Sequence, residues 1–225
     1  MKKLFDMNHP LMVALGIAGN LIVVNLLTLV LCIPLFTMGP ALTAMNRIMI
    51  PIVNDEAASI VSSYFRAFKE NLKKGFLLGL VLIGVMILLL CHYLAVVALI
   101  PVLRVVTYAM AIIALAVFFY AFALLARYEN TVGNTLKNAV LLAVSNFPRT
   151  LFMVVFAVAL WTVCIVFYRI GPPLLFMFGL SLPCYMNVLL LGDVFQKIEG
   201  ETKPSELKTA EEGSVTDKAE EPKEE

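Results

Sequence analysis

The sequence predicts an all-α fold, a polytopic helical bundle embedded in a membrane, and three observations lead to this prediction. Hydrophobic residues make up 61% of the 225 residues and charged residues 15%, whereas soluble domains are about half apolar and about a quarter charged. Five apolar runs are long enough to cross a bilayer, which takes roughly twenty helical residues. Basic residues gather in the segments between these runs rather than inside them.

The five predicted membrane spans differ in length and in the position of their prolines. The first is long enough to tilt, or to include a short interfacial turn. Pro183 lies inside the fifth span and is the expected kink there, because a proline ring displaces the carbonyl of the preceding turn. The runs are too many and too long for a cleaved signal peptide, so we expect all five in the mature chain. They cover approximately 11–38, 76–100, 105–126, 151–168 and 172–191.

The positions of Lys and Arg predict which side of the membrane each loop faces. Segment 39–75 carries five basic residues and 127–150 carries three, and five crossings put both segments on one side. By the positive-inside rule this side is the cytoplasm. We therefore expect a multi-pass plasma-membrane protein with its N-terminus outside and its C-terminus inside, although Lys2 and Lys3 argue mildly against an external N-terminus.

The loop segment before the second span is expected to form two amphipathic helices, 40–53 and 57–75. In 40–53, apolar residues recur at spacings of three and four, and Pro51 is expected to end or kink the helix. Helix 57–75 has apolar residues at strict four-residue steps, so it should lie at the membrane interface and run directly into the second span. The polar residues expected to turn away from the first apolar stripe are Thr43, Asn46 and Arg47.

The loop before the fourth span is expected to repeat this plan with one interfacial helix, 132–147, ended by Pro148. Asn71 and Asn146 each precede an apolar residue and a basic residue just before a span, 75 positions apart. This similarity suggests an internal duplication of an amphipathic helix followed by a membrane hairpin. Both copies would run in the same direction, unlike an inverted transporter repeat.

The chain changes character after about residue 197. Residues 199–225 hold ten acidic residues and four lysines, with no aromatic residue and no large apolar stripe. Such a segment buries too little surface to offset its ordering entropy. We therefore expect a membrane domain at 1–197 and a disordered, acidic, cytoplasmic tail at 198–225. The resulting excess of basic charge on the membrane domain indicates contact with a membrane surface rather than with nucleic acid.

Four polar side chains inside the spans are candidates for a ligand path, because desolvating them is costly. Asn20 and Asn25 are five residues apart, which is a rotation of about 140° on a helix, so they do not face one compact pocket. This geometry favours hydrogen bonds between helices over a shared substrate site, which remains the alternative. His92 is expected to be a structural histidine. The four candidates are Asn20, Asn25, His92 and Asn187.

The second span begins with two glycines, Gly75 and Gly79, that allow another helix to approach closely. We expect them to pack against a neighbouring span of the same chain, with the third span as the natural partner, and a homodimer face is the alternative. Five basic residues near this point form the candidate surface for contact with a partner or with lipid: Arg47, Arg66, Lys69, Lys73 and Lys74.

Motifs for chemistry are absent from the sequence. It holds no HExxH, GxSxG, Walker or GxGxxG pattern, and the predicted spans hold almost no titratable groups for acid–base chemistry. We therefore expect a protein that is not an enzyme, with no catalytic residue, no metal site and no cofactor.

Three stretches of the chain resemble the YesL family of small bacterial membrane proteins of unknown function. They are the asparagine and leucines at 25–27, the run 32–44 with its Pro-x-x-Thr-x-Gly-Pro-Ala pattern, and the helix 64–74 that enters a span. The likeness covers roughly 10–197, although the later spans match only in hydropathy. Within the pattern, we expect Thr37 to cap the loop helix and Gly39 to supply unusual backbone angles.

The resemblance implies a bacterial membrane protein with an accessory role in carbohydrate uptake or use, and it carries over no catalytic residue. Our leading expectation is therefore a non-enzymatic accessory or scaffold protein whose interior helices contact membrane lipid or a transporter component. The alternative is a small-solute transporter or channel that uses the four intramembrane polar residues.

Overall fold

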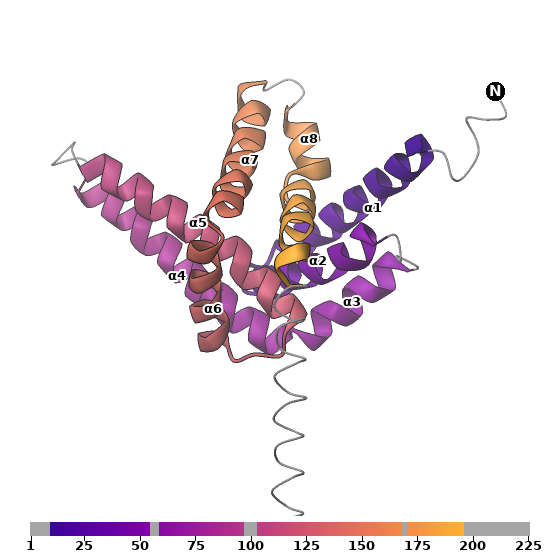
Figure 1. The fold of residues 1–225 in the computed structure, drawn as a ribbon, viewed down its shortest axis with the longest axis horizontal. Coiled ribbons are helices and arrows are strands. Elements are labelled where there is room, and N and C mark those ends of the chain that lie inside the picture. The colour runs from indigo at the N-terminus through magenta and orange to yellow at the C-terminus, as the bar shows by residue number, and fades with distance from the viewer. Residues whose placement is uncertain (1–9, 55–58, 97–102, 168–170, 196–225) are drawn as a thin grey trace, which may run out of the picture. The chain divides into compact units, whose positions relative to one another are not determined.

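The computed structural model describes residues 10–54, 59–96, 103–167 and 171–195 (Figure 1). This part of the chain consists of helices and holds no strand, so the predicted all-α bundle is confirmed. The helices are α1 (Pro10–Leu31), η2 (Leu35–Thr37), α2 (Met38–Val53), α3 (Ile60–Glu70), α4 (Leu72–Val96), α5 (Leu103–Arg127), α6 (Val132–Ser145), α7 (Phe147–Val166) and α8 (Gly171–Phe178), followed by Ser181–Phe195.

In the described part of the chain, four helices are long and apolar enough to cross a membrane: Met12–Leu31, Leu72–Ala95, Leu103–Arg127 and Phe147–Val166. Helices Gly171–Phe178 and Ser181–Phe195 bend by 50° relative to each other and together make a fifth candidate. In α5, 56% of the apolar stretch is buried by other parts of the protein, against 17% in α4. The chain is therefore a multi-pass bundle in which α5 is a central helix and α4 is peripheral.

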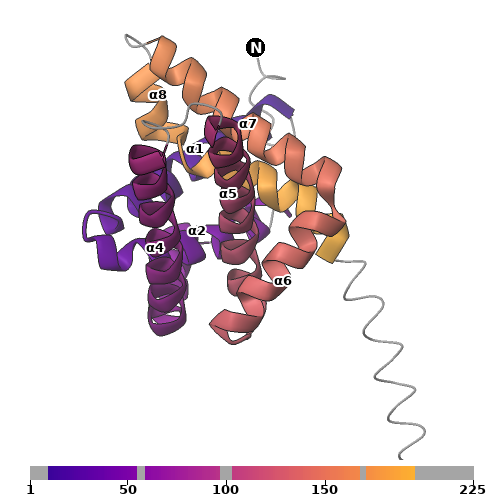
Figure 2. The ribbon, with the colours of Figure 1, turned by 90° about the vertical axis from the view of Figure 1, so that its left-hand side faces the viewer.

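The chain divides into two units, Met1–Val188 and Leu189–Glu225. Within the first unit, α4 packs beside α5, and α7 beside α8 (Figures 1 and 2). The second unit contains, among the described residues, only the end of helix Ser181–Phe195. The predicted tail 198–225 lies outside the described residues.

The first span is shorter than the predicted range 11–38, because α1 ends at Leu31. Pro34 follows, and a proline has no N–H to continue a helix and disfavours helical geometry in the residue before it. The expectation that the Thr37 side chain caps α2 is wrong, because it makes no capping hydrogen bond to this helix. Its hydroxyl instead donates to the carbonyl oxygens of Leu31 and Pro34 and closes the turn between α1 and α2.

Helix α2 is the core of the first unit, and Thr43 and Asn46, opposite its apolar stripe, are buried as well. It contacts α1, α3, α4 and α5. Thr43 and Asn46 are 0% and 6% exposed, and each side chain donates to a carbonyl oxygen one turn earlier, of Gly39 and Leu42 respectively. These internal bonds satisfy the polar donors without water. Arg47 is the side chain of this polar set that reaches the surface.

The start of α2 lies directly against the start of α4. A Cβ added to Gly39 would overlap the carbonyl oxygen of Gly75, and one added to Gly79 would lie 2.8 Å from the Cα of Gly39. Gly39 therefore allows α2 and α4 to approach closely. The expectation that it supplies unusual backbone angles is wrong, because its φ lies outside the left-handed region. The prediction that Gly75 and Gly79 pack against the third span is also wrong, because these glycines contact α2. Both glycines are buried in this contact.

Asn71 and Asn146 separate an amphipathic helix from a span in the same way. The main-chain N–H and the side-chain amide of Asn71 both donate to the carbonyl oxygen of Ala67, at 3.1 and 3.0 Å. The same groups of Asn146 donate to Leu142 at 3.0 and 3.2 Å. Helix 57–75 therefore does not run continuously into the second span, since α3 ends before Asn71. The internal duplication stays a prediction.

The prolines occupy helix starts more often than the sequence suggested. Pro148 lies in the first turn of α7 and does not end α6, which stops at Ser145. Pro51 lies inside α2, which continues to Val53. In the fifth candidate span, the break at 179–180 precedes Pro183, which falls in the first turn of the second helix. A first turn needs no N–H from proline, so the positions of Pro148 and Pro183 cost little.

Candidate functional site

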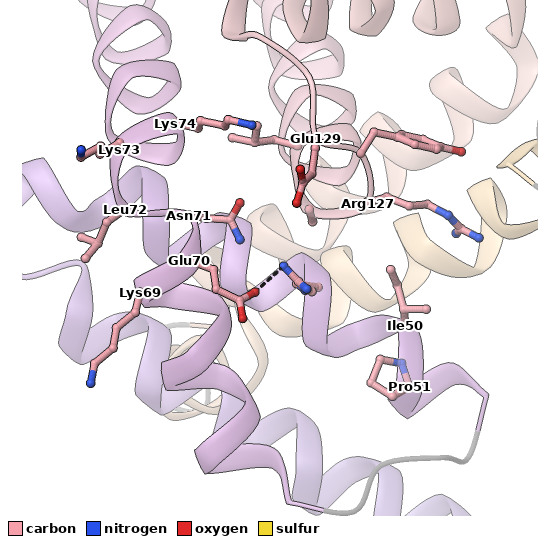
Figure 3. A pocket seen from close by; sticks show the side chains of 14 residues that line it. Ile50, Pro51, Lys69, Glu70, Asn71, Leu72, Lys73, Lys74, Arg127 and Glu129 are labelled. Atoms are coloured by element: carbon pink, nitrogen blue, oxygen red, sulfur yellow. Dashed lines mark ion pairs between the residues drawn. The ribbon is translucent and has the colours of Figure 1, made fainter.

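A basic pocket lies where α2, α3, α4 and the end of α5 meet, with a volume of about 960 Å³ (Figure 3). Five of its lining residues are basic and two are acidic, so the field inside it is positive. Apolar residues, among them Leu72 and Ile50, line the rest of the pocket. The charged residues that line this basic pocket are Arg47, Lys69, Glu70, Lys73, Lys74, Arg127 and Glu129.

One ion pair crosses the basic pocket, from the Arg47 guanidinium on α2 to the Glu70 carboxylate on α3, at 2.8 Å (Figure 3). The two side chains are 47% and 46% exposed, and a pair in such contact with water stabilises a fold by at most about 1 kcal/mol. The pair removes one charge of each sign, so the pocket keeps its excess of positive charge.

The structure brings together four of the five basic residues predicted as a contact surface. Arg47, Lys69, Lys73 and Lys74 line the basic pocket, whereas Arg66 is exposed outside it. The sequence reasoning missed Arg127 and Glu129 as members of this site. Their position could have indicated this, because five crossings put the end of the third span on the same side of the membrane as segment 39–75.

Asn25 joins α1 to the break between the last two helices, through three hydrogen bonds. Its side-chain amide donates to the carbonyl oxygen of Phe176 at 2.7 Å, and its side-chain oxygen accepts the N–H groups of Leu180 and Ser181, both at 2.9 Å. The Trp161 indole N–H donates to the carbonyl oxygen of Gly179 at 2.9 Å. Asn25 is fully buried and its amide is committed to this helix break.

The other intramembrane candidates do not join Asn25 in one cluster. The Asn187 amide donates to the carbonyl oxygen of Phe119 on α5 at 3.3 Å, and its side-chain oxygen has no partner among the described residues. Asn20 and His92 are half-buried at other positions on α1 and α4. Within the described ranges, no group of three or more His, Cys, Asp or Glu side chains is placed to hold a metal ion.

Tyr64 ties the loop helix α3 to the core beneath the basic pocket. Its hydroxyl lies 2.9 Å from the Thr28 hydroxyl on α1 and donates to the Ala41 carbonyl oxygen on α2 at 3.0 Å. The side chain is fully buried. Burial raises the pKa of the Tyr64 phenol, and the hydrogen bond with Thr28 lowers it by a smaller amount. The neutral phenol therefore holds three helices together.

Replacing Tyr64→Phe is expected to lower the free energy of unfolding by about 1 kcal/mol, since the hydrogen bonds of the hydroxyl are lost. The unfolded chain releases this proton near pH 10, before the folded protein does, so the phenol's contribution is present below pH 10 and declines above it. The variant should lack this part of the decline. Thermal unfolding in detergent from pH 8 to 11 measures both effects.

The matched control is Tyr108→Phe, because Tyr108 is 54% exposed. It should change the unfolding free energy by less than about 0.5 kcal/mol. Equal effects of the two variants at neutral pH would contradict the role of the Tyr64 hydroxyl.

Comparison with known proteins gives one result, a match to a family. No curated protein and no solved structure matches the chain. The family match covers the second half of α1 and all of η2, α2 and α3, and it extends to Tyr93 in α4. It includes Asn25, Tyr64 and the glycines at which α2 meets α4. Residues 21–93, about a third of the chain, match the family described as "Protein of unknown function, DUF624", which is consistent with the YesL resemblance.

Proposed function

We propose that the chain is a non-enzymatic accessory or scaffold protein of the bacterial plasma membrane, which presents its basic pocket to a partner. One observation carries the proposal: the fully buried Asn25 side chain is committed to bonds at a helix break, whereas basic residues of four helices line one open pocket. The basic pocket, in contrast, is open at the surface, and Lys69, Lys73 and Lys74 are exposed there.

The elements around the basic pocket form a braced platform, which suits a contact surface. Helix α2 is buried among four neighbours, and α3 is tied to α1 and α2 through Tyr64. Groups held on packed helices keep their positions better than groups on loops. Binding a partner would then order the side chains of Lys69 and Arg47 but not the helix backbone that carries them, which keeps the entropic cost low.

The orientation and the biological setting are part of the proposal. The positive-inside rule assigns the basic pocket to the cytoplasmic side, with the N-terminus outside and the C-terminus inside. The resemblance to the YesL family suggests that the partner is a component of a carbohydrate transporter. A homodimer is a further possible assembly, although its face would have to lie away from the buried Gly75 and Gly79.

Affinity capture after in-membrane crosslinking tests the scaffold role. We expect the tagged full-length chain to retain a transporter component, and we expect deletion of the gene to reduce carbohydrate uptake. A capture without any reproducible partner, together with unchanged uptake in the deletion strain, would refute the proposal. An unrelated tagged multi-pass protein, expressed at the same level, controls for nonspecific capture.

A second candidate, a small-solute transporter, is favoured by the bent fifth span. Discontinuous helices supply binding sites in many transporters, because their ends expose free backbone groups. Here Asn25 and Trp161 already bond to four backbone groups at or beside the break. Uptake of labelled solutes into vesicles containing the purified protein is the deciding measurement, and uptake above that of empty vesicles would favour the transporter.

A further inference from the structure

An apolar groove lies on α4 beside the basic pocket. It has a volume of about 340 Å³, and its lining includes Phe76, Gly79 and Leu80 of α4 and Gly39 of α2. Gly39 and Gly79 contact each other through their backbones, and because neither has a side chain, neither fills the groove. Phe76 and Leu80 are 41% and 56% exposed, so the described part of the protein leaves them largely uncovered.

The groove and the basic pocket share one face of α4. Leu72 lines the basic pocket, while Phe76 and Leu80 line the groove. These residues follow one another at four-residue steps, which places each about one turn above the last on the same face of a helix. A ligand on this face of α4 therefore meets positive charge at one end and an apolar channel at the other.

The position of this face along α4 matches the edge of a membrane. The candidate span begins at Leu72, so Lys73 and Lys74 lie in its first turn, at the level where a helix enters the lipid headgroups. Leu80 lies two turns deeper, beside acyl chains. Charge and apolar surface thus follow the order of the two parts of a phospholipid.

We propose that the basic pocket and the apolar groove form one binding site for an anionic phospholipid. The phosphate lies beside Lys69 and Lys73, whose side chains extend to the same side of the α3–α4 junction as Leu72 (Figure 3), and one acyl chain follows α4 past Phe76 and Leu80. An acidic protein segment would match the charge of the pocket but would leave the apolar groove empty. This inference rests on the proposed function because it uses the same basic pocket: the lipid headgroup lies on the side of Lys69 and Lys73, and the rest of the pocket is left to a protein partner.

Native mass spectrometry of the purified full-length protein tests the charged half of the site. The delipidated protein is titrated with phosphatidylglycerol and with phosphatidylcholine of equal chain length. We expect phosphatidylglycerol to bind about 10-fold more tightly. The double variant Lys69→Gln/Lys73→Gln should lose about 10-fold of this affinity. The control Arg66→Gln/Lys137→Gln, which removes two exposed cations outside the basic pocket, should keep it.

Two further arms test the apolar half and separate a lipid from a soluble phosphate. Leu80→Trp fills the groove and should weaken phosphatidylglycerol binding, whereas Leu77→Trp, on an exposed site outside the groove, should not. Glycerol 1-phosphate should compete poorly with the lipid.

Three results would overturn the proposal. They are equal affinities for the two lipids, equal losses in the two double variants, and glycerol 1-phosphate or an acidic peptide binding as tightly as phosphatidylglycerol. These measurements use the purified protein alone, so they are independent of partner capture. A failed lipid titration thus leaves the scaffold role to be judged by the capture experiment.

Discussion

Replacing Gly39→Ala is expected to destabilise the protein by about 3 kcal/mol or more, which is the upper end of the cost of overpacking a core. The new methyl group would overlap the carbonyl oxygen of Gly75 and approach the Cα of Gly79. Both are backbone atoms, so no side-chain rotation relieves the clash, and α2 must move away from α4. Thermal unfolding in detergent micelles, followed by size-exclusion chromatography, measures the loss.

Gly84→Ala is the matched control, because a Cβ added at Gly84 on α4 would have no other heavy atom within 4 Å. Alanine is favoured over glycine inside a helix by roughly 0.5–1 kcal/mol, so this variant should be as stable as the parent or more stable. If Gly39→Ala and Gly84→Ala unfold at the same temperature, the close contact between α2 and α4 is not important for stability.

Replacing Asn25→Leu is the second change with a large expected effect. It removes one donor and one acceptor that together bond to three backbone groups, of Phe176, Leu180 and Ser181. Each buried polar group left without a partner costs about 1–3 kcal/mol, so we expect a total loss of about 3 kcal/mol or more. Thermal unfolding measures this loss.

Hydrogen exchange at single amides locates the effect of Asn25→Leu. The N–H groups of Leu180 and Ser181 should exchange faster in the variant, because their acceptor is gone. The control is Asn20→Leu on the same helix, since Asn20 is half-buried and has no hydrogen bond to another described residue. If both variants leave exchange at Leu180 and Ser181 unchanged, the brace at the break is not formed by Asn25.

The Asn25 brace also bears on the transporter alternative. A break in a membrane helix is tolerated where its backbone groups find partners within the protein. The bonds from Asn25 and Trp161 meet this requirement, so the bend has a structural explanation that needs no ligand. A transporter would need these groups free at some stage of its cycle.

The sequence predicted the fold class and the approximate spans because hydropathy is a local property. A run of about twenty apolar residues indicates a membrane helix whatever its neighbours are. Four of the basic residues at the pocket were also found in this way, since Arg47, Lys69, Lys73 and Lys74 lie in the basic segment between the first two apolar runs. Even the Asn71 and Asn146 junctions were visible as a repeated local pattern.

Only the tertiary structure decided which surfaces meet. Periodicity cannot show that α2 is buried on both faces, because Thr43 and Asn46 look polar until their bonds to their own helix are seen. Glycine spacing likewise indicates a close contact but not its partner, which is Gly39. Asn25 and the helix break are about 150 residues apart, and Arg127 joins the basic pocket from a different loop. Such pairings depend on how helices pack, and a chain's local pattern does not encode the distances between them.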